Sequence, residues 1–147
     1  MSEKKIDLIE LYTRVLGEEV KNYTLPPPSF SIMETEILEY DEEKKSILVK
    51  MPVLELWLNP YSTMQGGMIV GAIDNAVGPL SMLVAPLNMT RSIDTKLLKA
   101  ITMDVGHIYV RATLVEQKKR RLTFEVSVKD SQGEVYAKAT LTNFIMA

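Results

Sequence analysis

The stretch from Met68 to Leu87 constrains the fold more than any other part of the chain, because it is the longest run rich in apolar residues. Placed on a helix, its apolar residues lie on every side, which is typical of a helix surrounded by protein. Asp74 and Pro79 interrupt the run and two glycines precede it, so it is a poor candidate for a membrane span. We predict a buried core helix of roughly twelve to eighteen residues, kinked or ended at Pro79.

Strand-like patterns flank this helix on both sides. They cover residues 30–40 and 45–53 before it, and residues 92–101, 107–117, 121–129 and 135–145 after it. The alternation is clearest where Leu122 and Phe124 point to one face and Thr123 and Glu125 to the other. The turns between neighbouring strands are short, which favours antiparallel pairing. The sequence therefore predicts an α+β fold in which one antiparallel sheet wraps around the central helix.

The N-terminal part has a different pattern. Residues 5–20 carry apolar side chains at helical spacing, which predicts an extra, amphipathic helix at the N-terminus. Three consecutive prolines, Pro26 to Pro28, cannot continue that helix and predict an extended connector. We therefore divide the chain into a helical segment, residues 1–25, and a main domain, residues 26–147.

Composition argues against several classes of function. The 147 residues include no cysteine and one histidine, so neither a thiolate nucleophile nor a metal site is expected. The formal charge of −2 gives no reason to expect binding to nucleic acid or to an anionic membrane. The N-terminal residues mix charges and lack the apolar run of a signal peptide, so we expect a cytoplasmic protein.

Asp74 is the exception in the apolar central helix. An ionised carboxylate in such surroundings costs several kcal/mol unless it is paired or hydrogen-bonded. Two interpretations stay open. Asp74 either faces a solvent-filled groove or bonds a neighbouring backbone group, or it acts as a general base or nucleophile.

Two glycines at the helix start favour the chemical interpretation. Glycine lets a ligand approach the backbone N–H groups of Gly66 and Gly67, at the positive end of the helix dipole, where they could form an oxyanion hole. Eight residues of helix, or ~12 Å, separate Gly66 from Asp74. One chain cannot direct both groups at one carbonyl, whereas two antiparallel helices related by a two-fold axis can. An active enzyme of this design must be at least a dimer.

The segments Asn59–Gly67 and Asp74–Gly78 resemble the hot-dog-fold thioesterases of the phenylacetate-degradation and human thioesterase superfamily member type. The likeness extends, in the order of the elements, over roughly residues 30 to 146. The family motif combines an asparagine-bearing loop, a His-Gly-Gly at the helix start, an acidic residue farther along the helix, and often a serine or threonine on the next strand. The resemblance implies a hot-dog fold.

The resemblance also implies roles for individual residues. Asn59 would help to bind the thioester, and the N–H group of Gly66 would polarise its carbonyl. Asp74 would activate water or attack directly, with Ser92 orienting that water. Gln65 stands where the family usually has histidine, and its amide can donate a hydrogen bond but cannot titrate near neutrality.

Three functions stay open. The first is an acyl-CoA thioesterase-like hydrolase with no cofactor beyond the coenzyme A of its substrate, working as a homodimer or as a dimer of two dimers. The second is a non-catalytic or very slow acyl-CoA-binding or regulatory protein, because loss of one transition-state donor typically costs ~10²–10³-fold. The third is an interaction module whose N-terminal helix, within residues 1–25, binds a partner.

Some features have both a functional and a structural interpretation. The basic run of Lys118, Lys119, Arg120 and Arg121 could contact the phosphates of coenzyme A, or could form a solvated hairpin tip. His107 is expected to be structural. The nine methionines could line an acyl tunnel or simply fill the core.

Overall fold

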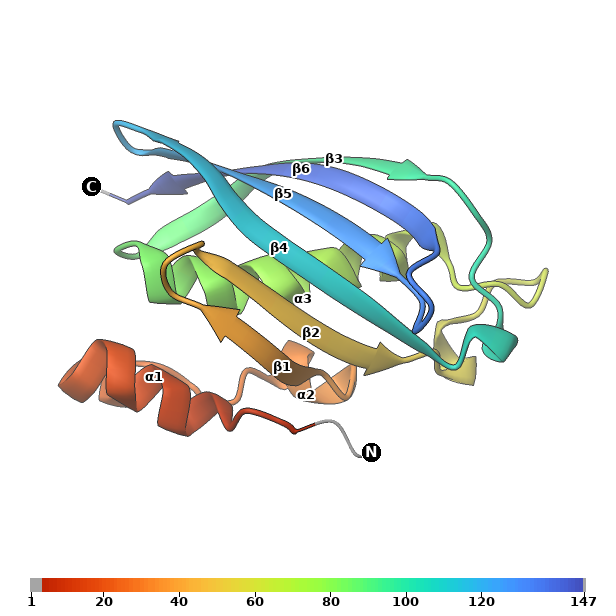
Figure 1. Cartoon of the computed structure of the whole chain (residues 1–147), viewed down its shortest axis with the longest axis horizontal. Coiled ribbons are helices and arrows are strands. Elements are labelled where there is room, and N and C mark those ends of the chain that lie inside the picture. The colour runs from red at the N-terminus through yellow and green to blue at the C-terminus, as the bar shows by residue number, and fades with distance from the viewer. Residues whose placement is uncertain (1–3, 147) are drawn as a thin grey trace.

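The computed structural model describes residues 4–146, which form a six-stranded antiparallel sheet wrapped around one long helix. In the order in which they pair, the strands are β1 (Glu36–Asp41), β2 (Ser46–Pro52), β4 (His107–Lys118), β5 (Arg121–Lys129), β6 (Val135–Ile145) and β3 (Asn88–Leu97). The helices are α1 (Leu8–Leu16), α2 (Pro28–Ile32) and α3 (Gly66–Val84), with 3₁₀ turns η1 (Gly17–Asn22), η2 (Glu55–Trp57) and η3 (Met103–Val105). Figure 1 shows α3 lying along one face of the sheet, with α1 and α2 beside it. The predicted α+β fold and the N-terminal helix are confirmed.

Apolar side chains at alternate strand positions close around α3. In β5, Leu122, Phe124 and Val128 are fully buried, as the alternation predicted. Ile73 and Leu80 of α3 are fully buried as well. By length and composition α3 could cross a membrane, yet it packs against β2, β3, β4 and β5 as the centre of the core. The interpretation of this helix as a core element is confirmed.

The central helix is longer than predicted. It continues for 19 residues through Pro79 to Val84, so of the two effects predicted for Pro79, a kink or an end, the end is wrong. Proline removes one backbone donor from a helix. Because Pro79 is buried among neighbouring elements, the surrounding packing outweighs that loss and the helix continues.

Two predicted strands have different boundaries. Residues 30–32 belong to α2 and not to a strand, because Pro28 stands in the first turn of a helix, where its missing N–H costs nothing. β3 begins at Asn88, earlier than predicted, and does not reach Ile101. The Ile101 carbonyl instead accepts a hydrogen bond from the N–H of Met64 (2.7 Å), which holds the loop before α3.

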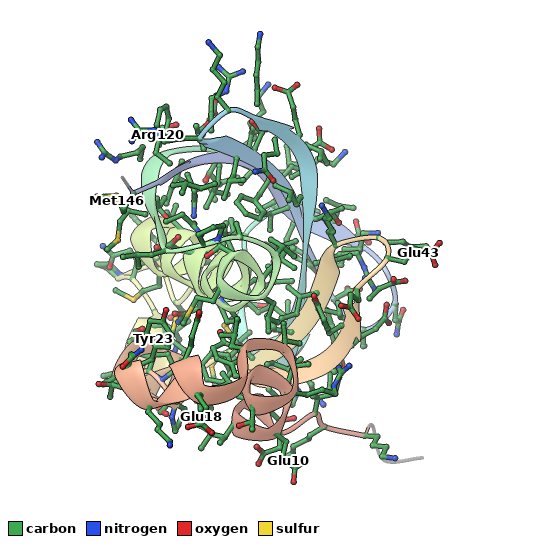
Figure 2. The ribbon with its side chains drawn as sticks, turned by 90° about the vertical axis from the view of Figure 1, so that its left-hand side faces the viewer. Glu10, Glu18, Tyr23, Glu43, Arg120 and Met146 are labelled. Carbon is green, nitrogen blue, oxygen red and sulfur yellow. The ribbon has the colours of Figure 1, made fainter. Side chains whose placement is uncertain are left out.

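The N-terminal segment, defined here as residues 8–32, covers the side of α3 that the sheet leaves open (Figure 2). Tyr12 of α1 is fully buried. Asn75 of α3 anchors α2 by donating from Nδ2 to the carbonyl of Ser29 (2.9 Å). The apolar face of α1 is therefore occupied within the chain, which argues against a free helix that binds a partner. The boundary predicted after residue 25 falls between η1 and α2.

Strand β3 forms one edge of the sheet and runs back alongside α3. At one end of the strand, Leu97 lies so close to the helix start that a Cβ added at Gly66 would be 3.1 Å from Leu97 Cδ1. At the other end, Thr90 reaches Asp74. The edge strand β3 thus lies next to both Gly66 and Asp74, the two residues of α3 to which the sequence analysis assigned chemical roles.

Candidate active site

Asp74 is half-buried on α3 and is held by a residue of β3. The Thr90 hydroxyl donates a hydrogen bond of 3.0 Å to Asp74 Oδ1. This bond offsets part of the cost of placing a carboxylate on an apolar helix. Among residues 4–146 no lysine or arginine pairs with Asp74, so its second oxygen is available to a ligand.

A cavity of about 350 Å³ lies beside Asp74, between α3, β3 and the N-terminal segment. Its buried side includes Tyr12, Phe30, Pro79, Ser81 and Asn143, and its exposed rim includes Glu19, Ser29, Leu87 and Met89. Tyr23, labelled in Figure 2, is a half-exposed residue of the N-terminal segment that also lines the cavity. The N-terminal segment therefore forms one wall of the cavity that Asp74 also lines.

Two polar atoms of residues that line this cavity are buried without a hydrogen-bond partner in the described structure. Asn88 Nδ2 donates to the carbonyls of Pro86 (2.8 Å) and Ser81 (3.2 Å), which fixes the orientation of its amide. Asn88 Oδ1 then accepts from Asn143 Nδ2 (2.8 Å), which leaves Asn143 Oδ1 unpaired. The Tyr12 hydroxyl is also unpaired, and burial raises its pKa, so it stays protonated. Such atoms are uncommon in folded proteins and require an explanation.

A second hollow, of about 270 Å³, lies at the start of α3 and is bordered by Gly66, Asn59 and Lys99. Gln65 is the N-cap residue, and its exposed side chain makes no capping hydrogen bond. The first N–H groups of a helix have no acceptor within the helix. The N–H groups of Gly66 and Gly67 are therefore available to an anion or a carbonyl oxygen at the positive end of the helix dipole.

Asn59 shapes the loop that leads to this hollow. Its Oδ1 accepts from the N–H groups of Tyr61 (2.9 Å) and Thr63 (3.2 Å), and its Nδ2 donates to Thr63 Oγ1 (2.9 Å). These are the hydrogen bonds of an Asx-type turn. The structure uses Asn59 to set the loop conformation, and its contact with a thioester stays a prediction.

The site residues predicted from the sequence form two half-sites. Asn59, Gln65 and Gly66 gather at the start of α3, whereas Asp74 borders the other hollow. One chain therefore does not present the glycine N–H and the carboxylate to a common space. This separation is the one that the helix spacing predicted.

Thr90, and not Ser92, is the residue of β3 that bonds Asp74 in the described structure, and the role of Ser92 in orienting water stays a prediction. Ser92 is exposed and pairs with Thr142 on the outer face of the sheet, while Thr90 pairs with the buried Asn143 on the helix side. The register shift between Thr90 and Ser92 separates the two hydroxyls onto opposite faces. The hydroxyl that contacts Asp74 is that of Thr90, on the helix side of the sheet.

Sequence reasoning also missed Asn143. Its strand places Ala137, Ala139 and Leu141 on the buried side, and Asn143 continues that alternation with a polar residue. A polar residue in the buried phase of a strand is a signal that can be read from sequence. No comparable signal marks Tyr12, which has the apolar spacing of an ordinary helix residue.

The predicted coenzyme A contacts lie at the turn between β4 and β5. Lys118, Lys119, Arg120 and Arg121 are exposed and border a shallow hollow with Phe144. Phe144 pairs with Arg121 on one side and with Met89, a rim residue of the Asp74 cavity, on the other. The basic run thus lies toward the Asp74 end of β3, on the side of the molecule opposite α1 (Figure 2). Its contact with phosphates stays a prediction.

The structure also places His107 and the acidic residues that could ligate a metal. His107 is the exposed first residue of β4, in keeping with a structural role. Within residues 4–146 no group of three or more histidine or acidic side chains could hold a metal ion.

Comparison with known proteins finds similar folds but no similar sequences among family models and curated proteins. No protein-family model matches the chain, and no curated protein matches it in sequence. The structure of E. coli PaaI, from the phenylacetic acid degradation operon, aligns with a TM-score of 0.78 and 14% identity over 96% of this chain and 97% of that chain. A phenylacetic acid degradation-related protein of Ralstonia eutropha aligns with a TM-score of 0.78 and 20% identity over 92% and 98%.

A third solved structure carries a ligand. It is a hypothetical thioesterase protein of Streptococcus pneumoniae with coenzyme A, which aligns with a TM-score of 0.73 and 22% identity over 80% of this chain and 91% of that chain. The chain has the hot-dog fold predicted from its sequence, in the form found in thioesterases of the phenylacetate-degradation type.

Proposed function

We propose that this chain is a thioesterase-like hydrolase that cleaves acyl-CoA thioesters at sites shared between two subunits. The observation that carries the proposal is Asp74, a carboxylate on an apolar helix, held by Thr90 beside a cavity of about 350 Å³. The fold is shared with proteins described as hypothetical or putative thioesterases, one of them solved with coenzyme A. No metal or organic cofactor is required by this chemistry.

The edge strand supports assembly into a dimer. β3 exposes one side of its backbone over ten residues, and a long unpaired edge is a template for strand pairing. Met89, Leu97 and Leu98 at its ends are each half-exposed apolar side chains. Two β3 strands that pair antiparallel about a two-fold axis would bury this edge in both subunits. A homodimer is therefore proposed as the working unit, alone or within a dimer of two dimers.

The same pairing completes the site. Within one chain Gly66 lies beside Leu97, and Asp74 lies beside Thr90, at opposite ends of β3. Antiparallel pairing brings the Leu97 end of one strand to the Thr90 end of the other. Gly66 of the partner subunit would then lie near Asp74, and two equivalent sites would form.

The proposed mechanism is hydrolysis by general base catalysis. Asp74 removes a proton from water while the water oxygen attacks the thioester carbonyl carbon. The carbonyl oxygen becomes an oxyanion and accepts a hydrogen bond from the N–H of Gly66 of the partner subunit. The C–S bond then breaks, and the leaving thiolate takes the proton from Asp74, which yields the carboxylic acid and coenzyme A. Direct attack by Asp74 is the alternative first step.

Gln65 is the reason to keep a second candidate. Its amide can donate a hydrogen bond to the thioester, but its side chain is exposed and has no partner that orients it in the described structure. A site with a loosely held donor would turn over slowly, so a non-catalytic or very slow acyl-CoA-binding protein is the alternative. Gln65→His separates the two: a large gain in hydrolysis supports the slow protein, whereas a loss means that glutamine belongs to a working site.

The deciding experiment is hydrolysis of a panel of acyl-CoA thioesters, with Asp74→Asn assayed in parallel. Turnover that disappears in the variant supports the proposal, provided that sedimentation shows both proteins to be dimers of equal stability. Binding without turnover, detected by calorimetry and by mass spectrometry of the purified protein, favours the acyl-CoA-binding alternative. Neither binding nor turnover across the panel would refute both.

A further inference from the structure

Basic and apolar side chains meet at one corner of the sheet, where the turn between β4 and β5 lies against the end of β6. The strand register places Lys118 opposite Arg121, and Arg121 opposite Phe144. The N–H of Ile145 donates to the carbonyl of Arg120 (2.7 Å), which holds the turn against β6. Figure 2 shows Arg120 and Met146 at the same end of the molecule, opposite α1. The corner surface is defined here as the exposed residues of this region, Lys118, Lys119, Arg120, Phe144, Met146 and Leu87.

The basic side chains of the corner surface lack acidic partners. The neighbouring Arg121 pairs with Glu116 (3.2 Å), so its charge is compensated. Within residues 4–146, no acidic side chain pairs with Lys118, Lys119 or Arg120. The formal charge of the whole chain is −2, but exposed charges more than about 8 Å apart are largely screened at physiological salt. The corner surface is therefore locally positive, although the net charge of the chain is negative.

The apolar side chains of the corner surface are exposed beside these cations. Phe144, Met146 and Leu87 are 37%, 41% and 57% exposed. Met146 lies next to Leu87, because its N–H donates to the Leu87 carbonyl (2.9 Å). Exposed apolar side chains that lie together and border polar residues mark an interaction site. A soluble polyanion would contact the cations and leave the apolar side chains in water, so they indicate a partner that offers hydrocarbon as well as negative charge.

The dimer proposed above would leave the corner surface uncovered. Its interface is the backbone edge of β3, whereas Phe144 belongs to β6, one strand farther into the sheet. Asn143 is buried on the helix side, so the next side chain, Phe144, points to the outer face. Pairing of two β3 edges joins the sheets of the two subunits side by side and covers neither outer face.

We propose that the corner surface docks on the headgroup region of an anionic lipid bilayer. The three cations would contact the negative groups of the lipids, and the three apolar side chains would enter the boundary between headgroups and hydrocarbon. Stable attachment to a membrane surface takes two such contributions, and the corner surface combines them. Leu87 also lies on the rim of the cavity beside Asp74, so docking would bring the mouth of that cavity to the lipid surface.

The test is flotation of the purified full chain with lipid vesicles and without any thioester, so its outcome does not depend on the proposed hydrolysis. Vesicles of phosphatidylcholine are compared with vesicles in which about one lipid in three is phosphatidylserine. The charge variant is Lys119→Asn with Arg120→Gln. Lys119 has a φ of 57°, a conformation that asparagine tolerates better than lysine, so the turn should be retained.

A matched control makes the same chemical change at another hairpin. Lys44→Gln with Lys45→Asn removes two charges from the turn between β1 and β2, where Lys45 has a φ of 52°. This turn lies away from the corner surface, as the labels of Glu43 and Arg120 show in Figure 2. Thermal unfolding and sedimentation of every variant check that the fold and the assembly are those of wild type.

Wild type should bind the phosphatidylserine vesicles about tenfold or more above phosphatidylcholine alone, and high salt should weaken this binding. The charge variant should lose about tenfold or more, because each basic residue near an anionic surface strengthens binding roughly fivefold, while the control keeps wild-type binding. Phe144→Thr keeps every charge and should still weaken binding by about threefold or more.

Three results would overturn the inference. The first is wild-type binding that does not depend on phosphatidylserine, and the second is an equal loss in the charge variant and the control. The third is binding that depends on Lys119 and Arg120 but is unchanged in Phe144→Thr, which would favour a soluble polyanion such as RNA. Absent vesicle binding together with a changed sedimentation of the charge variant would mean that a second copy of the chain covers the corner surface, and would refute docking on lipid.

Discussion

The surroundings of Asp74 and of Gly66 on α3 differ in how far one chain encloses them. The Asp74 end is enclosed: Thr90 holds the carboxylate, and the N-terminal segment closes one side of the cavity. The Gly66 end is open: Gln65 is exposed, and the hollow lies beside the edge of the sheet. Within one subunit, therefore, the surroundings of Asp74 are largely complete, whereas the start of α3 faces outward.

This difference explains why the elements are arranged as they are. A carboxylate on an apolar helix needs a fixed hydrogen-bond donor from its own chain, because an unpaired one destabilises the fold. Backbone N–H groups at a helix start carry no such requirement, since water satisfies them until a ligand arrives. The chain can thus leave the Gly66 N–H open to solvent or to a ligand, but it cannot leave Asp74 without a hydrogen-bond donor.

The largest expected effect is at the enclosed end. Asp74→Asn keeps the size of the side chain and removes the base, so hydrolysis should fall by about 10²–10⁴-fold. The fold should be retained, because the amide can still accept a hydrogen bond from Thr90 Oγ1. Steady-state kinetics and thermal unfolding measure the two effects. Turnover that survives at more than a tenth of wild type would remove Asp74 from the chemistry.

The next effect tests the open end. In Gly66→Ala the added Cβ would lie 3.1 Å from Leu97 Cδ1, so the Leu97 side chain or the helix start must move by a few tenths of an ångström. A misplaced oxyanion donor costs up to about 10²-fold in turnover. Gly67→Ala is the matched control, because a Cβ there meets nothing within 4 Å. Equal activity in the two variants would mean that turnover does not depend on how closely the helix start at Gly66 packs against Leu97.

Mixing the Asp74→Asn and Gly66→Ala proteins tests whether Asp74 and Gly66 act across the subunit interface. A dimer that contains one Asp74→Asn chain and one Gly66→Ala chain would have one site in which both groups are intact. After subunit exchange about a quarter of wild-type activity should return, because half of the dimers are mixed and each holds one such site. Recovery monitored against time of mixing is the measurement. Mixed dimers without recovery would mean that both groups act within one chain.

A smaller effect is expected from the donor to the carboxylate. Thr90→Val removes the 3.0 Å hydrogen bond to Asp74 but keeps the shape of the side chain, so turnover should fall by about tenfold. Thr90→Ser should restore most of it. Ser92→Ala is the control, because Ser92 lies on the outer face of β3 and should not affect turnover. A larger loss in Ser92→Ala than in Thr90→Val would restore the role assigned from the sequence.

The different positions of Thr90 and Ser92 show that the sequence does not reveal which face of a strand a residue occupies next to a β-bulge. Periodicity sufficed to predict the helix α3 and the strand β5. In β5, apolar residues such as Leu122 and Phe124 occupy every second position and mark the buried face. It gives no warning of the bulge between Thr90 and Ser92, where one extra residue reverses the faces without any change in composition. The resemblance pointed to Ser92 on this strand, whereas the hydroxyl that contacts Asp74 in the structure is that of Thr90.

Features that depend on contacts between distant segments were also not predictable. The sequence indicated an amphipathic helix near the N-terminus, but its apolar spacing does not say which cavity Tyr12 helps to line. Pro79 shows the same limit, because its effect on the helix is decided by the packing around it and not by its local preference. The separation of Gly66 from Asp74 along one helix was predicted, because the length of helix between two residues is a local property.

The smallest expected effect concerns the basic run, which lies toward the enclosed end of β3. Lys118→Gln with Arg120→Gln should raise KM for coenzyme A thioesters by about threefold at low salt, since exposed charge pairs are individually weak. The rise should disappear at high salt, where screening removes such pairs, and should be absent for thioesters of N-acetylcysteamine, which has no phosphates. Lys138→Gln, an exposed change on β6, is the control. A rise that is the same for both carriers would mean that the run supports the hairpin and not the phosphates, and the enclosed end would then recognise the acyl group alone.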